Sequence, residues 1–229
     1  MRNPFPDNEV FKQFLGLKDY FRKYQTKASY SRIREIATIA RILYQSGENI
    51  AFDFLGSVNF GMAQDHSDVD LVLYLECEET DDEINEKNCP RFAKIQNLMH
   101  SLLSHELKES KYIIEIVDVI NLSTLDKAIK NNDYEHDLIA RFIFYRTICR
   151  GVNKKVLHPL EKKIIEKSDL FHKIEESLTD ALIEFTRTST HGASFKKYIK
   201  RLEEKNIHIP ASILEKVVEY LDISKDLDI

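Results

Sequence analysis

The chain has 229 residues, of which 43% are hydrophobic and 31% charged, as is typical of a folded globular protein and not of a disordered one. Its 6 Gly and 5 Pro fall far below average usage of about 7% and about 5%, which excludes collagen-like proteins and Gly-rich or Pro-rich linkers. The formal net charge of −5 argues against a dedicated nucleic-acid binder, because such a chain repels a phosphate backbone on average.

The cysteines and the hydropathy pattern indicate in which cellular compartment we expect the protein. Cys77, Cys89 and Cys149 are odd in number and fit neither C-x-x-C nor a zinc-ligand spacing, so we expect neither a disulfide framework nor a structural zinc. The start, MRNPFPDNEVF, lacks the apolar run of a signal peptide, and no stretch approaches the roughly 18 apolar residues of a membrane span. We therefore expect a soluble, cytoplasmic protein with no membrane partner.

The first half of the chain mixes the periodicities of helices and strands. Apolar residues recur at i, i+3, i+4 and i+7 over residues 31–46, which predicts a helix with Ser31 as its N-cap and Gly47 as its stop. Short β-rich runs and an acidic stretch complete this half. In chain order we predict a helix over 31–46, strands over 50–55 and 69–75, an exposed acidic loop over 76–88, a helix over 91–105 and a strand over 112–120.

After Asn121 every predicted element is a helix. The change of pattern predicts two domains: residues 1–121, with a core at about 30–121, and a helical domain over 122–229. The predicted helices of the second domain cover residues 122–130, 134–150, 159–166, 169–188, 194–205 and 211–222.

An alternating acid pair opens the second predicted strand. Asp68 and Asp70 are two positions apart, so in a strand their side chains leave on one face, with Cα atoms about 6.5–7 Å apart. Two carboxylates about 4 Å apart repel by roughly 4 kcal/mol at an effective dielectric constant near 20, a cost that a cation between them would remove. Oxygen ligands without His or Cys favour Mg²⁺ or Mn²⁺ over zinc.

A Gly-Ser turn precedes this acid pair. Gly56 and Ser57 directly follow the first predicted strand, and a glycine there lets backbone N–H groups approach a phosphate while the serine hydroxyl adds a donor. Ser67, just before Asp68, is in place to cap or hydrogen-bond the carboxylate. A nucleoside triphosphate is the natural ligand of such a turn beside a metal site.

The run Leu55-Gly56-Ser57, ten further residues and then Asp68-Val69-Asp70-Leu71 resembles the signature of polymerase β-type nucleotidyltransferases, especially their minimal and aminoglycoside-modifying branches. The resemblance covers about residues 30–121. It implies an α+β fold, with a mixed β-sheet and flanking helices, here followed by the all-helical second domain. It also implies a metal site of two carboxylates on one strand and a third on a later strand.

The third carboxylate of the resembled family falls within YIIEIVDVI, residues 112–120. The family's catalytic acid matches Glu115, and Asp118 is the alternative. Glu115 and Asp118 differ by three positions, so strand alternation puts them on opposite faces and only one can join Asp68 and Asp70. Glu115 is preferred, although glutamate departs from the more usual aspartate.

The resemblance implies a Mg²⁺-dependent transfer of an NMP, with AMP favoured, from an NTP to a hydroxyl acceptor with release of pyrophosphate. In it Asp68 and Asp70 hold both metal ions, Glu115 completes the site of the ion that activates the acceptor, and Gly56 with Ser57 clamps the β- and γ-phosphates. The acceptor is a small molecule or a protein side chain, with RNA third. The alternative is a nucleotide-binding antitoxin or regulatory module without turnover, and the helical domain is a candidate surface for a homodimer or a toxin-type partner.

Three further polar residues have two interpretations each. Arg146 and Arg150 share a face of the predicted helix 134–150, where they either contact phosphates or simply face solvent opposite its apolar stripe. Asp53, inside the first predicted strand, is interpreted as a capped or edge polar residue and not as a metal ligand.

Overall fold

The computed structural model describes residues 9–80, 83–106, 112–167, 174, 177–185 and 191–222. At its centre lies a four-stranded sheet with the order β3-β2-β1-β4. β2 and β3 run parallel, and β1 is antiparallel to both β2 and β4, so the sheet is mixed and the α+β class is confirmed. The strands are β1 (Ala51–Phe54), β2 (Val69–Leu75), β3 (Ile114–Asn121) and β4 (Arg150–Val152).

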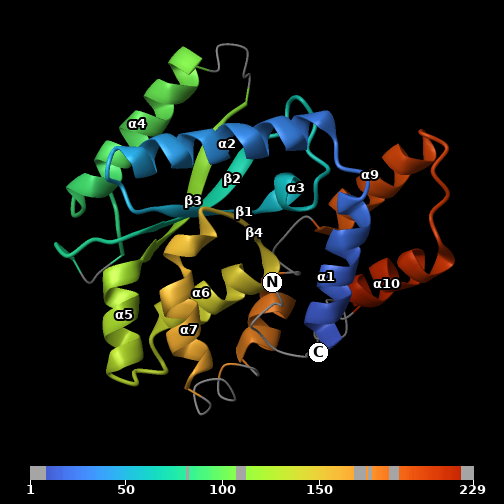
Figure 1. Cartoon of the computed structure of the whole chain (residues 1–229). Helices are drawn as coiled ribbons and strands as arrows, with labels where there is room; N and C mark the ends of the chain where they lie inside the picture. Colours follow the sequence, from blue (N-terminus) through green and yellow to red (C-terminus); the bar gives the residue numbers. More distant parts are fainter. Residues whose placement is uncertain are drawn as a thin grey trace.

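Strand alternation gives the sheet two buried faces. On β2, Leu71 and Leu73 belong to one hydrophobic cluster, while Val72 and Tyr74 belong to another. The first cluster is covered by α2 (Lys27–Gln45) and α4 (Pro90–Glu106), which lie on the same side of the sheet in Figure 1. The second face is covered by α5 (Leu122–Lys130), α6 (Asp137–Ile148) and α7 (His158–Ile165).

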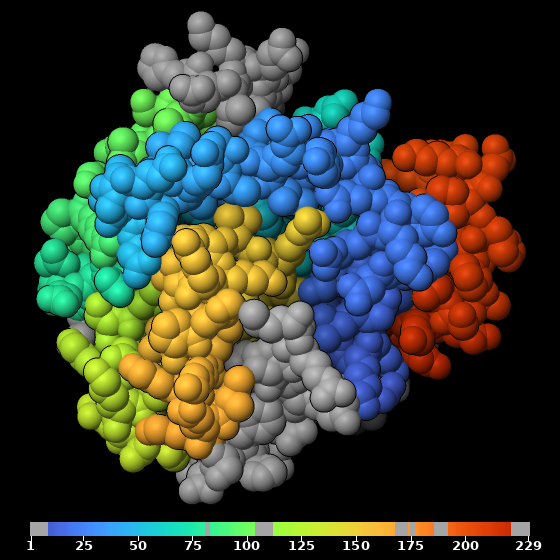
Figure 2. Space-filling view, in the orientation of Figure 1, coloured from blue at the N-terminus to red at the C-terminus, as the bar shows by residue number. Residues whose placement is uncertain are grey.

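The helix α1 (Glu9–Arg22), for which the sequence carried no prediction, packs against the C-terminal helices α9 (His191–Glu203) and α10 (Ala211–Asp222). The rings of Phe21 and Phe195 stack with centroids 5.7 Å apart. Figure 2 shows α1 beside α9 and α10 at one side of the molecule. Residues on both sides of the predicted 121/122 boundary therefore share one hydrophobic cluster, and the division into two domains stays a prediction.

The sequence predicted only helices after Asn121, but the second half of the chain also contains the strand β4. The predicted helix 134–150 ends at Ile148, because Cys149 turns extended with φ −95° and ψ 164°, and Arg150 starts β4. Two short elements were not predicted from the hydrophobic periodicity, namely α3 (Gly56–Asn59) and the 3₁₀ turn η1 (Lys154–Val156). The remaining predicted helices agree closely in position, and the described residues 177–185 are helical as expected.

The start of α2 also differs from the prediction. The helix begins at Lys27, and its N-cap is Thr26, whose side chain accepts a hydrogen bond from the Ser29 backbone N at 3.1 Å. Ser31 therefore lies inside the helix, since the apolar pattern starts only after the first turn. Gly47 does end the helix, with a left-handed φ of 92°.

Candidate active site

The Gly-Ser turn lies directly against the acid pair. Leu55 donates its backbone N–H to the Asp70 carbonyl oxygen at 2.9 Å, which holds the end of β1 against the start of β2. Gly56 then turns with a left-handed φ of 53°, and a Cβ atom built on it would lie 2.5 Å from Asp70 Oδ2. Any larger residue here would collide with the carboxylate, so the glycine is required both for backbone conformation and for space.

Strand β3 brings Glu115 beside Asp70. The parallel register pairs Asp70 with Glu115, and Asp68 Oδ1 accepts a hydrogen bond from the Ile113 backbone N at 3.3 Å. Burial raises the pKa of the half-buried Asp70 carboxyl, and the negative charges of Glu115 and then Asp68 raise it further. The negative charges of Glu115 and Asp68 therefore both disfavour ionisation of Asp70.

A β-bulge overturns the expectation that Glu115 and Asp118 lie on opposite faces. The register runs from Leu71 opposite Ile116 to Val72 opposite Asp118, so Val117 has no partner on β2. This extra residue shifts the alternation of β3 by one position. Glu115 and Asp118 pair with Asp70 and Val72, so they lie on the same sheet face. Alternation alone predicted the opposite, because it assumes an unbroken strand.

Asp118 nevertheless forms an ion pair with an arginine. Arg141 on α6 donates Nε to Asp118 Oδ2 at 3.1 Å and also ion-pairs through Nη2 with Oδ1, while its Nη1 binds Asp137 at 2.9 Å. Burial, together with the nearby Asp118 carboxylate, raises the pKa of the Tyr145 phenol. Asp118 is thus already neutralised by a protein cation, whereas Glu115 is exposed beside Asp70.

The two serines differ in their surroundings. Ser57, half-buried, follows Gly56 in the turn and its carbonyl accepts from the Met62 backbone N at 2.9 Å. Ser67 Oγ accepts a hydrogen bond from the Gln64 backbone N at 2.8 Å. Among the described residues, Ser67 therefore stabilises the turn before β2 and makes no hydrogen bond to the Asp68 carboxylate that we expected it to cap.

Arg146 is neither a phosphate contact nor a solvent-facing side chain, so both interpretations of it are wrong. Its side chain is 5% exposed and donates to Asp53 at 2.7 Å and to Glu161 at 2.7 Å. Asp53, fully buried, also accepts from the Tyr74 hydroxyl at 2.6 Å. Helix α6 is apolar on nearly all sides, so Arg146 is buried by the core and neutralised by carboxylates from β1 and α7.

Arg150 takes a different position at the end of the sheet. It opens β4 opposite Phe54, two residues before Gly56, and its Nη1 donates to Gln25 Oε1 at 3.1 Å. Burial and the nearby positive charge of Arg22 lower the pKa of the Arg150 guanidinium. Its one described side-chain hydrogen bond goes to a neutral amide, so this positive charge has no carboxylate partner among the described residues.

The strand order therefore places the candidate residues in one row across the end of the sheet. Glu115 lies on β3, Asp70 on β2, Gly56 after β1 and Arg150 at the start of β4. Carboxylates gather at one side of the glycine turn and a basic side chain at the other. Phe54 pairs with both Arg150 and Leu71, so Arg150 leaves the sheet on the face opposite Asp70 and Glu115. The acidic part of this row can hold a cation, and the glycine turn can receive the phosphates of a bound ligand.

A second group of metal-type ligands was missed by the sequence. Cys77, Glu79 and Cys89 bring three ligand atoms within 4.8 Å of one another, and among the described residues they are the one group that does so. The oxygens of Asp68, Asp70 and Glu115 are therefore spread more widely. Eleven residues separate the two cysteines, a spacing with no zinc signature, and only the return of the chain from β2 to α4 brings them together.

Comparisons with models of protein families, with curated proteins and with solved structures find no match for this chain. Within the described part of the chain, no helix is long and apolar enough to cross a membrane.

Proposed function

We propose that this chain is a metal-dependent nucleotidyltransferase of the polymerase β type, which moves an NMP from an NTP to a hydroxyl acceptor. The observation that supports this most is the pairing of Asp70 with Glu115 beside a glycine that admits no side chain. Three mutually repelling carboxylates at the starts of two neighbouring strands make physical sense when a divalent cation is bound.

The donor set fits Mg²⁺ or Mn²⁺, because Asp68, Asp70 and Glu115 offer only carboxylate oxygens. When bound there, Mg²⁺ would supply the charge that stabilises the attacking and leaving oxygens of a phosphoryl transfer. Asp70 on β2 and Asp68 directly before it would orient that charge. Glu115 adds the third negative group on the side where the acceptor hydroxyl would be held.

The other side of the row would bind the triphosphate. Gly56 leaves the backbone of the turn open to a close approach, and Ser57 adds a hydroxyl. Arg150, with a neutral hydrogen-bond partner in Gln25, contributes a positive charge at the same end of the sheet. Arg146 has no part in this proposal, since its guanidinium is buried against Asp53 and Glu161.

The acceptor is a small hydroxylated molecule or a protein side chain. The net charge of −5 disfavours a long nucleic acid, so RNA comes third. Labelled nucleotide incubated with a cell extract separates the three, because the label appears in the small-molecule, protein or RNA fraction.

Calorimetric titration of ATP, GTP, CTP and UTP in the presence of Mg²⁺ tests the proposal. We expect at least one nucleotide to bind, and binding to be lost in the double variant Asp68→Ala/Asp70→Ala. The matched control is Asp65→Ala, which removes an exposed acid from the same connecting segment and leaves the backbone carbonyl that accepts from Arg32 in place. Binding of none of the four nucleotides, or undiminished binding by the double variant, would overturn the proposal.

A further inference from the structure

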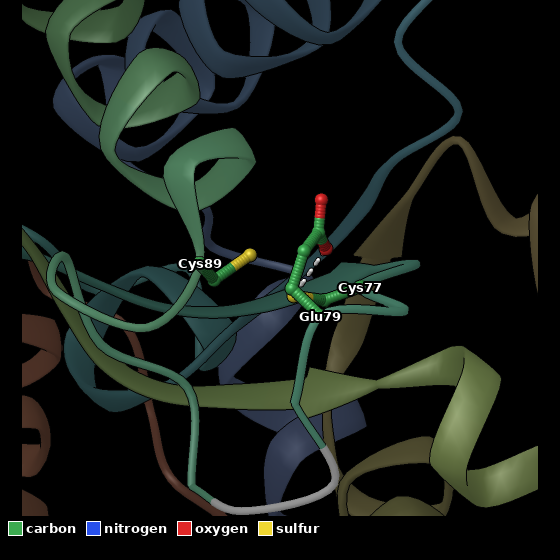
Figure 3. A group of neighbouring side chains, drawn as sticks. All are labelled: Cys77, Glu79 and Cys89. Atoms are coloured by element: carbon green, nitrogen blue, oxygen red, sulfur yellow. Dashed lines mark hydrogen bonds between the residues drawn. The ribbon is translucent and has the colours of Figure 1, made fainter.

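Two buried thiols and a carboxylate meet at the start of the acidic loop. Cys77 and Cys89 are 2% and 0% exposed, and the Cys77 thiol donates a hydrogen bond to Glu79 Oε2 at 3.1 Å. Figure 3 shows Cys77 and Glu79 on the segment that leaves β2, with the Cys89 sulfur directed toward them from the start of α4. The three ligand atoms lie within 4.8 Å of one another.

The fold holds both cysteines in place by their backbones. Asn121, at the end of β3, accepts from the Cys77 backbone N at 3.2 Å and donates to the Cys77 carbonyl at 2.9 Å. The Cys89 carbonyl accepts from the Phe92 backbone N at 3.0 Å in the first turn of α4. Cys77 lies two residues after the end of β2 and Cys89 directly before α4, so neighbouring secondary structure positions both cysteines, and Glu79 lies further out on the loop.

Helix α4 begins at this cluster and supplies the nearest positive electrostatic groups. Cys89 directly precedes α4, a helix of 17 residues whose N-terminal end stabilises a thiolate. Arg91, in the first turn of the same helix, adds a positive charge near the Glu79 carboxylate.

We propose that Cys77 Sγ, Cys89 Sγ and a Glu79 carboxylate oxygen bind a zinc-class divalent cation, with water in the fourth position. Two thiols and one carboxylate form a borderline-soft donor set that selects zinc over magnesium. Zn–S bonds of about 2.3 Å at tetrahedral angles put two sulfurs about 3.8 Å apart, so the observed cluster needs only small shifts. Each thiol loses one proton on binding, so one Zn²⁺ enters and two protons leave to solvent.

A Cys77–Cys89 disulfide is the competing use of this pair. It would leave Glu79 without a role in the cluster, and it would require an oxidant to reach two sulfurs that are almost wholly buried. The metal uses all three groups. The site would join Cys77 to Cys89, on either side of the buried Ile84, which is 6% exposed. The zinc site is independent of the carboxylate row and of the proposed nucleotidyl transfer.

Cobalt(II) titration of the full chain, stripped of metal with a chelator and kept reduced, tests the site. We expect one equivalent of Co²⁺ to give a sulfur-to-cobalt charge-transfer band with the intense visible bands of tetrahedral cobalt, and Zn²⁺ to bleach both. Titration of Zn²⁺ in weakly buffered solution should release two protons per ion. Glu79→Gln should weaken Co²⁺ binding by roughly 10–100-fold, and Cys77→Ser by more.

Two matched controls accompany the titration. Glu78→Gln removes the exposed acid next to Glu79, and Cys149→Ala removes the third cysteine, buried elsewhere in the core, so neither should change the band. Because Glu79 is exposed, its variant tests the site even if a cysteine variant fails to fold. Absence of the charge-transfer band in the reduced wild-type chain, or its full retention in Glu79→Gln and Cys77→Ser, would overturn the proposal. A Cys77–Cys89 disulfide that persists after reducing treatment would do the same.

Discussion

Gly56 lies so close to the Asp70 carboxylate that no side chain fits between them: a Cβ on Gly56 would lie 2.5 Å from Asp70 Oδ2. Next to this position, the Leu55 N–H donates a hydrogen bond to the Asp70 carbonyl oxygen. The carboxylate that we assign to metal binding is therefore positioned by the absence of a side chain on the neighbouring strand. This contact joins the Gly-Ser turn and the acid pair into one site.

Replacing Gly56 by alanine should both strain the turn and displace the Asp70 carboxylate. The left-handed φ of 53° alone costs a non-glycine residue on the order of 1–2 kcal/mol, and the collision adds to it. We expect a loss of stability of roughly 2–4 kcal/mol by urea unfolding, together with loss of Mg²⁺-dependent nucleotide binding by calorimetry.

Gly47→Ala is the control for that variant. Gly47 also has a left-handed φ, 92°, but a Cβ there meets nothing within 4 Å, so only the conformational cost of about 1 kcal/mol applies. In the background of Asp70→Ala, Gly56→Ala should become about as mild as Gly47→Ala. Equal costs for Gly56→Ala with and without the Asp70 carboxylate would show that the contact does not matter.

Asp70→Asn should stabilise the metal-free protein at neutral pH. Burial and the charges of Glu115 and Asp68 raise the folded-state pKa of Asp70, so its protonated form is favoured in the fold and ionisation costs stability as pH rises past the unfolded value of 3.8. The asparagine variant lacks this cost. Its advantage in melting temperature over the wild type should appear as pH rises above about 4 and should disappear in millimolar Mg²⁺, whereas a lower melting temperature throughout would contradict the argument.

Glu115 and Asp118 should separate function from stability. Glu115→Gln removes an exposed charge beside Asp70, and we expect nucleotide transfer to fall by on the order of 10²–10³-fold with little change in stability. Asp118→Asn breaks the ion pair with Arg141, so it should cost about 1–2 kcal/mol of stability and change transfer far less. Urea unfolding and transfer rates measure the two effects, and the reverse pattern would make Asp118 the third carboxylate.

Arg146→Met should be strongly destabilising. The change leaves Asp53 buried with only the Tyr74 hydroxyl and leaves Glu161 without its cation, and breaking a buried pair in this way costs about 3–5 kcal/mol. Arg41→Met on the exposed side of α2 should change stability by less than about 0.5 kcal/mol. A cost for Arg146→Met no larger than for Arg41→Met, measured by denaturant unfolding, would argue against the buried network.

Lys18 should make the protein more stable in mild alkali. Burial lowers its pKa from 10.5 to about 8, and its ammonium donates to the Ile148 carbonyl at 2.5 Å. Because the unfolded chain holds this proton more tightly, the contribution of Lys18 to stability rises between about pH 8 and 10.5, by on the order of 3 kcal/mol. Lys18→Met should remove that rise, and the exposed Lys12→Met on the same helix should keep it, as pH-dependent unfolding will show.

Local patterns in the sequence already contained the sheet strands β1, β2 and β3, most helices and the acid pair. The β-rich apolar run over residues 69–75 is a property of a few neighbouring residues, and the structure has the same strand there. The position of Gly56 immediately after β1 follows from the same local reading. These features need no knowledge of distant contacts, since hydrophobic periodicity and turn residues determine them.

Long-range packing decided the rest. The bulge at Val117 depends on how β3 pairs with β2, and it puts Asp118 on the face of Asp70. The burial of Arg146 depends on carboxylates 93 and 15 residues away in the chain, which no helical pattern of α6 reveals. Cys77 and Cys89 meet because β2 and α4 pack side by side. Strand register, ion pairing in the core and thiol clustering arise between distant segments, so a periodicity that spans one helix or strand carries no signal for them.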